Sequence, residues 1–108
     1  MQNEENYQIA FQIIAVAGDS KSNSMLAIDV ASEGDFQKAE LYLEKAEQSL
    51  KEAHGLQLQM IREEAKGNHV EVNIVLIHAQ DHLTMAMLTK ERAEETIRLY
   101  KIIQSLKS

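Results

Sequence analysis

Residues 36–64 read FQKAELYLEKAEQSLKEAHGLQLQMIREE, and the spacing of their side chains decides the fold class. A mostly apolar seam recurs at alternating steps of three and four residues, and its members are Phe36, Ala39, Leu43, Ala46, Leu50, Ala53, Gln57, Met60 and Glu64. Such a heptad seam, with Lys and Glu outside it, is typical of a helix that packs along other helices. It predicts a helix over residues 36–66, roughly 46 Å long at about 1.5 Å per residue. A helix of that length in a short chain indicates a bundle or coiled coil.

The flanking segments predict two more helices and two short connections. A helix is expected over residues 4–32, with a kink or an interruption in the polar stretch 18–24, which begins at Gly18. Residues 33–35 predict a turn in which Gly34 ends one helix and Asp35 caps the next. Residues 67–69 predict the second turn, and a third helix over residues 70–106 follows. The β-branched run 70–75 also fits a strand, but the sequence offers no second strand to pair with it. We therefore expect an all-α chain that forms one domain over residues 1–108.

The third predicted helix is apolar on almost every face between residues 70 and 88. One seam consists of Val72, Leu76, Ala79, Leu83, Ala86, Ala93, Ile97 and Tyr100, and a second consists of Ile74, Ile77, Asp81, Met85, Leu88, Leu99 and Ile102. A helix that is apolar all round is buried all round. Because two partner helices cannot easily surround a third, the pattern predicts that this helix packs against copies of itself in an oligomer.

Charge and composition exclude several classes of function. The chain has 108 residues and a formal net charge of −6, which argues against nucleic acid and anionic membrane surfaces as partners and fits a basic protein partner. It has no cysteine, so disulfides and thiolate chemistry are excluded. The acidic N-terminus is unlike a signal peptide, and no apolar stretch approaches the roughly 20 residues that span a bilayer. We therefore expect a cytoplasmic protein with no direct membrane insertion.

Residues 72–83, VNIVLIHAQDHL, place polar side chains in the most apolar part of the chain. On a helix, His78 lies one turn from both Asp81 and His82, whereas Gln80 points away from them. One interpretation is a buried hydrogen-bonded network. A second is a metal site, although Ala79 stands where the zinc hydrolase motif has Glu and no third ligand is evident. A third is nucleophilic catalysis, because a neutral imidazole can attack phosphorus.

The run HAQDHL at residues 78–83 resembles the signature of the lactose/cellobiose IIA family of the bacterial phosphoenolpyruvate-dependent sugar phosphotransferase system. The resemblance covers essentially the whole chain, and it includes Ala17-Gly18 with Ser22, residues 33–36 followed by Ala39, residues 52–54 with Gln57, and Glu64-Ala65. Residues 19–22 and Thr84 depart from the family pattern. Neither departure touches His78 or Asp81, so both are expected to affect partner contacts rather than the central chemistry.

The resemblance implies a fold, a function and site residues. The fold would be a three-helix up-down-up antiparallel bundle that trimerises into a nine-helix bundle. His78 would accept a phosphoryl group from the histidine-containing phosphocarrier protein and pass it to a cysteine of the IIB component, for uptake and phosphorylation of a β-linked disaccharide of the cellobiose, chitobiose or lactose class. Three copies of Asp81 would share one Mg²⁺. Gln80 and His82 could donate hydrogen bonds to the phosphoryl group. The alternative function is a non-enzymatic helical oligomeric interaction module with a buried network of His78 and Asp81.

Overall fold

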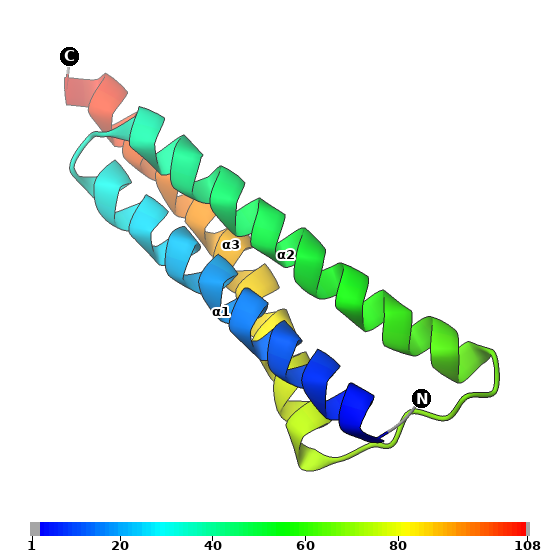
Figure 1. Cartoon of the computed structure of the whole chain (residues 1–108). Helices are drawn as coiled ribbons and strands as arrows, with labels where there is room; N and C mark the ends of the chain where they lie inside the picture. Colours follow the sequence, from blue (N-terminus) through cyan, green and yellow to red (C-terminus); the bar gives the residue numbers. More distant parts are fainter. Residues whose placement is uncertain (1–2, 108) are drawn as a thin grey trace.

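The computed structural model describes residues 3–107, and these residues form three long α-helices joined by short loops (Figure 1). Helix α1 spans Asn3–Ser32, α2 spans Phe36–Ala65 and α3 spans Ile74–Lys107. The helices run up, down and up along a rod of 59 × 19 × 19 Å. No strand occurs between residues 3 and 107. The prediction of an all-α, three-helix antiparallel bundle is therefore confirmed.

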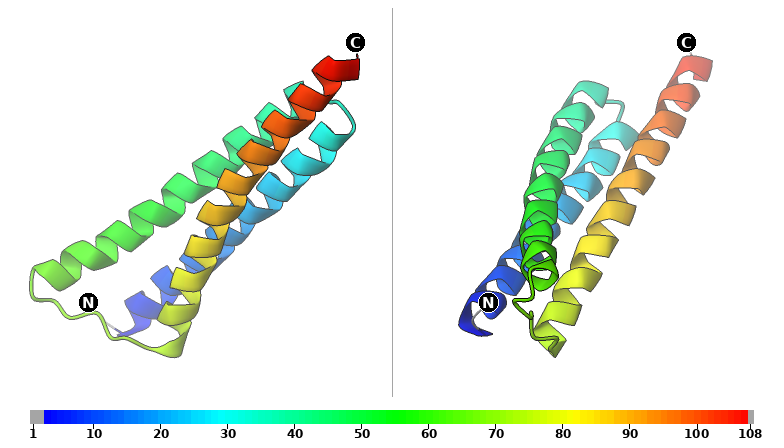
Figure 2. Two further views of the ribbon diagram at one scale, coloured as in Figure 1. Left: turned by 180° about the vertical axis from the view of Figure 1, so that it is seen from behind. Right: turned by 90° about the vertical axis from the view of Figure 1, so that its right-hand side faces the viewer.

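Helix α1 lies between the other two helices in its packing and contacts both of them extensively. Both α2 and α3 pack along it, whereas they contact each other much less. Figure 2 shows α2 and α3 diverging toward the loop that joins them.

Small buried side chains let the helices approach closely. The seam predicted for α2 is confirmed, because its fully buried members are spaced seven residues apart at Ala39, Ala46 and Ala53. The first seam of α3 behaves in the same way, with Ala79, Ala86 and Ala93 fully buried and Leu83 and Ile97 nearly so. Ile13 of α1 is the largest apolar side chain that is fully buried. This repeat fixes the register of the helices, because a shift of one residue would bring larger side chains into the contact.

The expected interruption of the first helix is wrong. Residues 18–24 are helical, and α1 continues through them without a break. The polar residues Ser20 and Ser24 are fully buried on the packed face, and the Ser20 hydroxyl donates a hydrogen bond of 2.8 Å to the carbonyl oxygen of Ala46 in α2. A serine is small enough to occupy a position that alanine fills elsewhere, so polarity in this stretch marks close helix contact rather than a break.

The first connection between helices agrees with the prediction from the sequence, and the second differs from it. Gly34 has a φ of +89°, and an Asp35 carboxylate oxygen accepts a hydrogen bond of 3.1 Å from the Lys38 amide, as expected for a helix cap. The third helix begins at Ile74, four residues later than predicted. The Asn73 side chain caps it by accepting a hydrogen bond of 2.9 Å from the Leu76 amide. The preceding residues 68–73 are not helical; Val70 is buried among them, and its amide donates a hydrogen bond to Glu64.

The second seam of α3 is exposed in the single chain, and we call it the outer stripe. Its members are Ile74, Ile77, Asp81, Met85, Leu88, Leu99 and Ile102, and Ile74 is 82% exposed. The third helix is therefore not buried all round within one chain. Nothing in helices α1 to α3 combines the length and the apolar character that a membrane-spanning helix requires.

Candidate functional site

The site is centred on two histidines near the beginning of α3. The Nε2 atoms of His78 and His82 lie 3.0 Å apart, and the rings meet edge to face with centroids 4.4 Å apart. The helix produces this pairing because residues four apart share a face. Buried Ala79 and Leu83 anchor the same segment against the bundle. His78 itself is exposed, so another protein can reach its ring.

The contact between the rings constrains their protons. At 3.0 Å, one Nε2 must donate a hydrogen and the other must offer its lone pair. If His82 donates, His78 Nε2 is unprotonated and has the lone pair that a nucleophile requires. If His78 donates, its Nδ1 holds the lone pair instead. The arrangement therefore supports one nucleophilic imidazole with a hydrogen-bond donor beside it.

The buried network of histidine and aspartate is not present. His78 and Asp81 are both exposed, and no hydrogen bond or ion pair joins Asp81 to any residue from 3 to 107. Asp81 lies on the outer stripe, among apolar side chains. No group of three or more His, Cys, Asp or Glu side chains suited to a metal ion is found among the described residues. A metal ion bound through Asp81 would therefore need ligands from other copies of the chain.

Gln80 lies on another side of α3, facing α2. The Nε2 amide of Gln57 donates a hydrogen bond of 2.5 Å to its Oε1 atom. The pair borders an apolar groove of about 260 Å³ between the end of α2 and the start of α3, lined also by Met60, Ile61, Glu64, Val70, Val72 and Leu76. The sequence places Gln57 only in the α2 seam. Its hydrogen bond to Gln80 depends on the relative rotation of two helices, which no local pattern records.

The remaining histidines lie apart from this pair. His54 Nε2 is 3.2 Å from the sulfur of Met87, which links α2 to α3. His69 Nδ1 lies 2.7 Å from a carboxylate oxygen of Glu64. The hydrogen bonds from His69 and from the Val70 amide lower the pKa of Glu64. Neither histidine approaches His78 through any contact of the described residues, and both serve the geometry of the loop and of α2.

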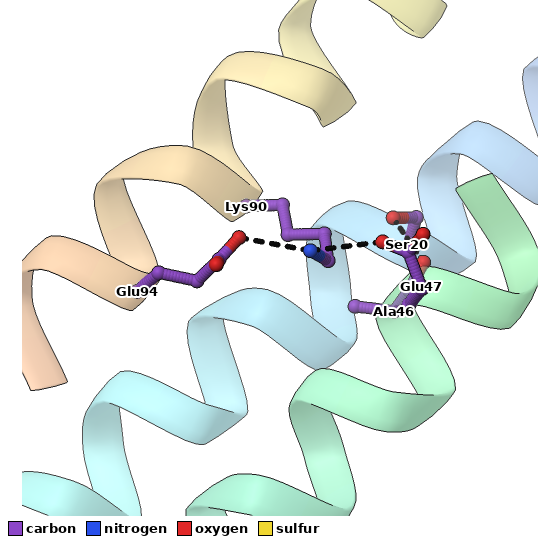
Figure 3. Close-up of polar contacts among 5 residues, drawn as sticks. All are labelled: Ser20, Ala46, Glu47, Lys90 and Glu94. Carbon is purple, nitrogen blue, oxygen red and sulfur yellow. Dashed lines mark hydrogen bonds and ion pairs between the residues drawn. The ribbon is translucent and has the colours of Figure 1, made fainter.

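A polar cluster ties α2 to α3 at the middle of the bundle (Figure 3). The Lys90 ammonium lies 2.8 Å from Glu47 of α2 and 2.8 Å from Glu94 of α3, and only 16% of its side chain is exposed. Burial alone would lower the pKa of Lys90, but its hydrogen bonds to the two carboxylates outweigh burial and raise it. The hydrogen bond from Lys90 lowers the pKa of Glu47. This cluster stabilises the α2–α3 contact.

His82 also borders a second groove, which runs along the outer face of α1. This groove has a volume of about 520 Å³ and is lined by Gly18, Lys21, Ser22, Met25, Leu26, Asp29 and His82. Since His82 contacts His78, the groove and the exposed imidazole belong to one continuous surface.

Comparison with known proteins finds similarity over nearly the whole chain. Residues 8–101 match the family described as "PTS system, Lactose/Cellobiose specific IIA subunit". The lichenan-specific phosphotransferase enzyme IIA component of Bacillus subtilis (strain 168) is 44% identical over 101 residues, which cover 94% of this chain and 92% of that protein. The lactose-specific EIIA component of Lacticaseibacillus casei is 37% identical over 105 residues, which cover 97% and 94%.

Solved structures of IIA components are also similar to this chain. The cellobiose-specific enzyme IIA from Bacillus anthracis superposes with a TM-score of 0.91 at 40% identity, covering 97% of this chain and 94% of that one. The IIA(Chitobiose) in a solution structure of its complex with HPr, from the N,N'-diacetylchitobiose branch of the Escherichia coli phosphotransferase system, superposes with a TM-score of 0.80 at 31% identity, covering 96% and 98%. Sequence and fold therefore agree over nearly the whole chain.

Proposed function

The chain belongs to the lactose/cellobiose-specific IIA family of the sugar phosphotransferase system, and on that premise we propose that His78 is the residue that carries the phosphoryl group. As a IIA component, the protein is a phosphotransferase that acts in sugar transport. The observation that carries the assignment of His78 is its exposed imidazole, with His82 Nε2 at 3.0 Å from its own Nε2. An exposed ring suits a carrier that two different proteins must reach in turn.

The donor in this proposal is the histidine-containing phosphocarrier protein, HPr. The IIA(Chitobiose), which is 31% identical in sequence to this chain, forms a complex with HPr. The acceptor is a cysteine of the IIB component, which then phosphorylates a β-linked disaccharide of the cellobiose, chitobiose or lactose class during uptake. In this proposal the protein exchanges phosphoryl groups with both partners in the cytoplasm.

The transfer itself demands positioning more than acid–base chemistry. The Nε2 lone pair of His78 attacks phosphorus in line with the donor's P–N bond. That bond breaks, its electron pair returns to the donor imidazole, and a new P–N bond forms to Nε2. In the second step His78 is the leaving group: a IIB thiolate attacks phosphorus, a P–S bond forms, the P–Nε2 bond breaks and its electron pair returns to the His78 ring. While His78 carries the phosphoryl group, the Nε2 hydrogen of His82 would donate to a phosphoryl oxygen instead of to the His78 lone pair, and the charged acceptor would strengthen that hydrogen bond.

Gln80 has a less direct place in this mechanism. Its Oε1 atom accepts a hydrogen bond from Gln57, and its amide hydrogens are the groups that could donate to a phosphoryl oxygen. The helix turns Gln80 away from His78 within one chain. Donation to the phosphoryl group therefore stays a prediction, and the Gln57 contact supports a role for Gln80 in fixing α2 against α3.

The outer stripe supports the proposal of a homotrimer. Its exposed apolar side chains lie on one face of α3, from Ile74 to Leu88 and again at Leu99 and Ile102, and exposed apolar faces are typical of association sites. Asp81 is the acidic residue within it. Three carboxylates brought together on an axis would repel one another, and a hard cation with oxygen ligands would offset that repulsion. The Asp81 side chain, which has no partner among residues 3–107, fits a structural Mg²⁺ shared by three copies.

Phosphorylation from phosphoenolpyruvate through the two general proteins of the system tests the function. Wild-type protein is expected to gain acid-labile phosphate, and His78→Ala is expected to gain none while keeping its helical content and oligomeric state. Label on His78→Ala would move the acceptor to another residue. No label on folded wild-type protein would instead favour a helical interaction module.

A further inference from the structure

The outer stripe of α3 is interrupted between Leu88 and Leu99, and two charged residues fill the gap. From Asp81 onward the members of the stripe follow alternating steps of four and three residues. The same steps continued from Leu88 reach positions 92 and 95 before they reach Leu99, and these positions hold Arg92 and Glu95. Both side chains are exposed. The two charges therefore lie on the same outer face of α3 as the apolar members of the stripe.

The contacts within one chain leave this pair of charges incomplete. Arg92 forms no hydrogen bond or ion pair within residues 3–107, although Glu95 is only three residues further along the same face. Glu95 pairs instead with Arg98, and its side chain is still 51% exposed in that pair. A carboxylate can accept several hydrogen bonds, so Glu95 can bind a second guanidinium. One chain thus presents an unpaired guanidinium beside a carboxylate that can accept one.

We propose that Arg92 and Glu95 form a ring of ion pairs between three copies of the chain, in which Arg92 of each copy binds Glu95 of the next. The inference rests on the proposed homotrimer and goes beyond it, because it assigns the residues that fix how the chains align. In parallel helices around a threefold axis, the two positions form adjacent layers about 4.5 Å apart along the axis. An arginine side chain spans that rise, and its planar guanidinium can bind a carboxylate through two hydrogen bonds.

Charge complementarity identifies copies of this chain as the occupant of the gap. Three copies of Arg92 alone, or of Glu95 alone, would repel one another, whereas adjacent layers of opposite charge offset the repulsion. A second copy presents both charges at the matching spacing. The apolar neighbours Leu88 and Leu99 are 54% and 50% exposed in one chain, and copies that cover them also shield the ion pairs from water.

The ring also explains how an apolar stripe can specify one alignment. Apolar side chains at repeating positions tolerate a shift of one chain by seven residues, because each then meets another apolar side chain. The same shift would place Arg92 against Leu99 and Glu95 against Ile102. A charge that is covered without a partner is costly, so the shifted assembly is disfavoured. Arg92 and Glu95 thus make the trimer specific rather than only stable.

Charge reversal tests the ring. The variants are Arg92→Glu, Glu95→Arg and the double variant that carries both changes. Glu52→Arg is the matched control, because Glu52 of α2 is exposed and forms no ion pair within the described residues. Sedimentation over a dilution series and in rising urea measures the trimer, and circular dichroism checks that each chain stays helical.

Each single reversal is expected to raise the concentration at which half of the trimers dissociate by about tenfold or more, because like charges then face one another. The double variant should stay within about threefold of wild type, and Glu52→Arg should match wild type. Mixing the Arg92→Glu and Glu95→Arg proteins should restore trimers, since each copy then meets the opposite charge on its neighbour. Only a contact between chains can be restored by mixing.

Two outcomes would overturn the ring alone: single reversals that trimerise as tightly as wild type, or a mixture of the two that recovers nothing. Wild-type protein that forms dimers, or stays monomeric at every concentration, would remove the proposed trimer and the ring together. Neither result bears on the phosphoryl group carried by His78, which the phosphorylation of His78→Ala tests separately. Failure of the ring and failure of the proposed carrier function are therefore distinguishable.

Discussion

At the scale of single residues, the contact between His78 and His82 links the resting and the phosphorylated protein. In the resting state, the ring of His82 can donate to the lone pair that must attack phosphorus. That hydrogen bond has to break for attack, and the same hydrogen is then free for a phosphoryl oxygen. In the proposed mechanism, His82 would therefore hold the nucleophile weakly before transfer and stabilise the added negative charge after it.

Replacing His82 measures this role. His82→Phe removes the donor while keeping a ring of similar shape, and we expect phosphorylation of His78 to slow by about 10- to 100-fold, the range for losing a hydrogen bond to a charged group. Single-turnover transfer from phosphorylated HPr provides the measurement. Gln80→Ala serves as the control, since Gln80 faces α2, and it should change the rate by less. Equal rates for wild type and His82→Phe would show that His82 does not stabilise the phosphoryl group.

The sequence predicts which side chains of the site lie together on the helix, but it does not predict which of them are exposed. Helical spacing alone predicts that His78 and His82 pair and that Gln80 points elsewhere. The sequence also suggests that His78 and Asp81 are buried, because both lie in an apolar run. In the structure, Ala79 and Leu83 take the buried face and the neighbouring apolar face stays open. Two apolar seams on one helix look alike in sequence, so only the packed bundle shows which one faces α1.

At the scale of helices, the weak α2–α3 contact depends on a few polar links, and Lys90 is the strongest. Its ammonium joins Glu47 across the two helices. Because Lys90 lowers the pKa of Glu47, the unfolded chain binds more protons than the folded chain at acidic pH. The stabilisation from Glu47 is therefore present above its ordinary pKa of 4.5 and is lost as pH falls through the lower folded value. The raised pKa of Lys90 acts at the other end, where stability is lost as pH rises above 10.5.

Glu47→Gln tests this link. At pH 7 we expect it to lower the free energy of unfolding by about 0.5–1 kcal/mol, a modest value because the Glu47 side chain is 41% exposed. The difference from wild type should shrink as pH falls below 4.5 and through the lower pKa of Glu47 in the folded chain, because Glu47 then becomes protonated in both states. Urea unfolding across this pH range is the measurement. Glu95→Gln, which removes an exposed ion pair to Arg98 on α3, should stay near wild type throughout. A difference that does not shrink as pH falls would argue against the ion pair.

The beginning of α3 shows where prediction of helices fails. Gly67 has a φ of +93°, and the sequence correctly suggests that a helix ends near it. The next helix does not start at once: residues 68–73 are not helical, and Val70 among them packs into the core. Asn73 is a favourable cap, but it sits inside a β-branched run that gives no periodic signal of a boundary. Burial of Val70 thus helps to set where α3 begins, which the local residue preferences do not determine.

At the scale of the whole molecule, a single chain leaves a large apolar surface unpaired. The outer stripe runs along most of α3, and Leu106 near its end is 79% exposed. Exposed apolar surface of this extent is costly in water, and each side chain that a neighbouring copy covers contributes roughly 25 cal/mol per Å² of apolar area. In the proposed trimer, Asp81 is the charged member of this stripe that would meet its counterparts from the other copies.

Asp81→Leu separates association from metal binding. If three Asp81 carboxylates meet around one Mg²⁺, replacing them with Leu removes the repulsion and the ion together, and trimers should persist with equal or greater stability. Wild-type trimers should weaken when a chelator removes the ion, whereas Asp81→Leu trimers should not respond. Analytical ultracentrifugation with and without the chelator measures both. Monomeric Asp81→Leu would contradict this account, because the apolar stripe alone would then be unable to hold the chains together. Asp81→Asn is the matched control: it removes the charge without adding apolar surface, so it should trimerise without Mg²⁺ but less tightly than Asp81→Leu.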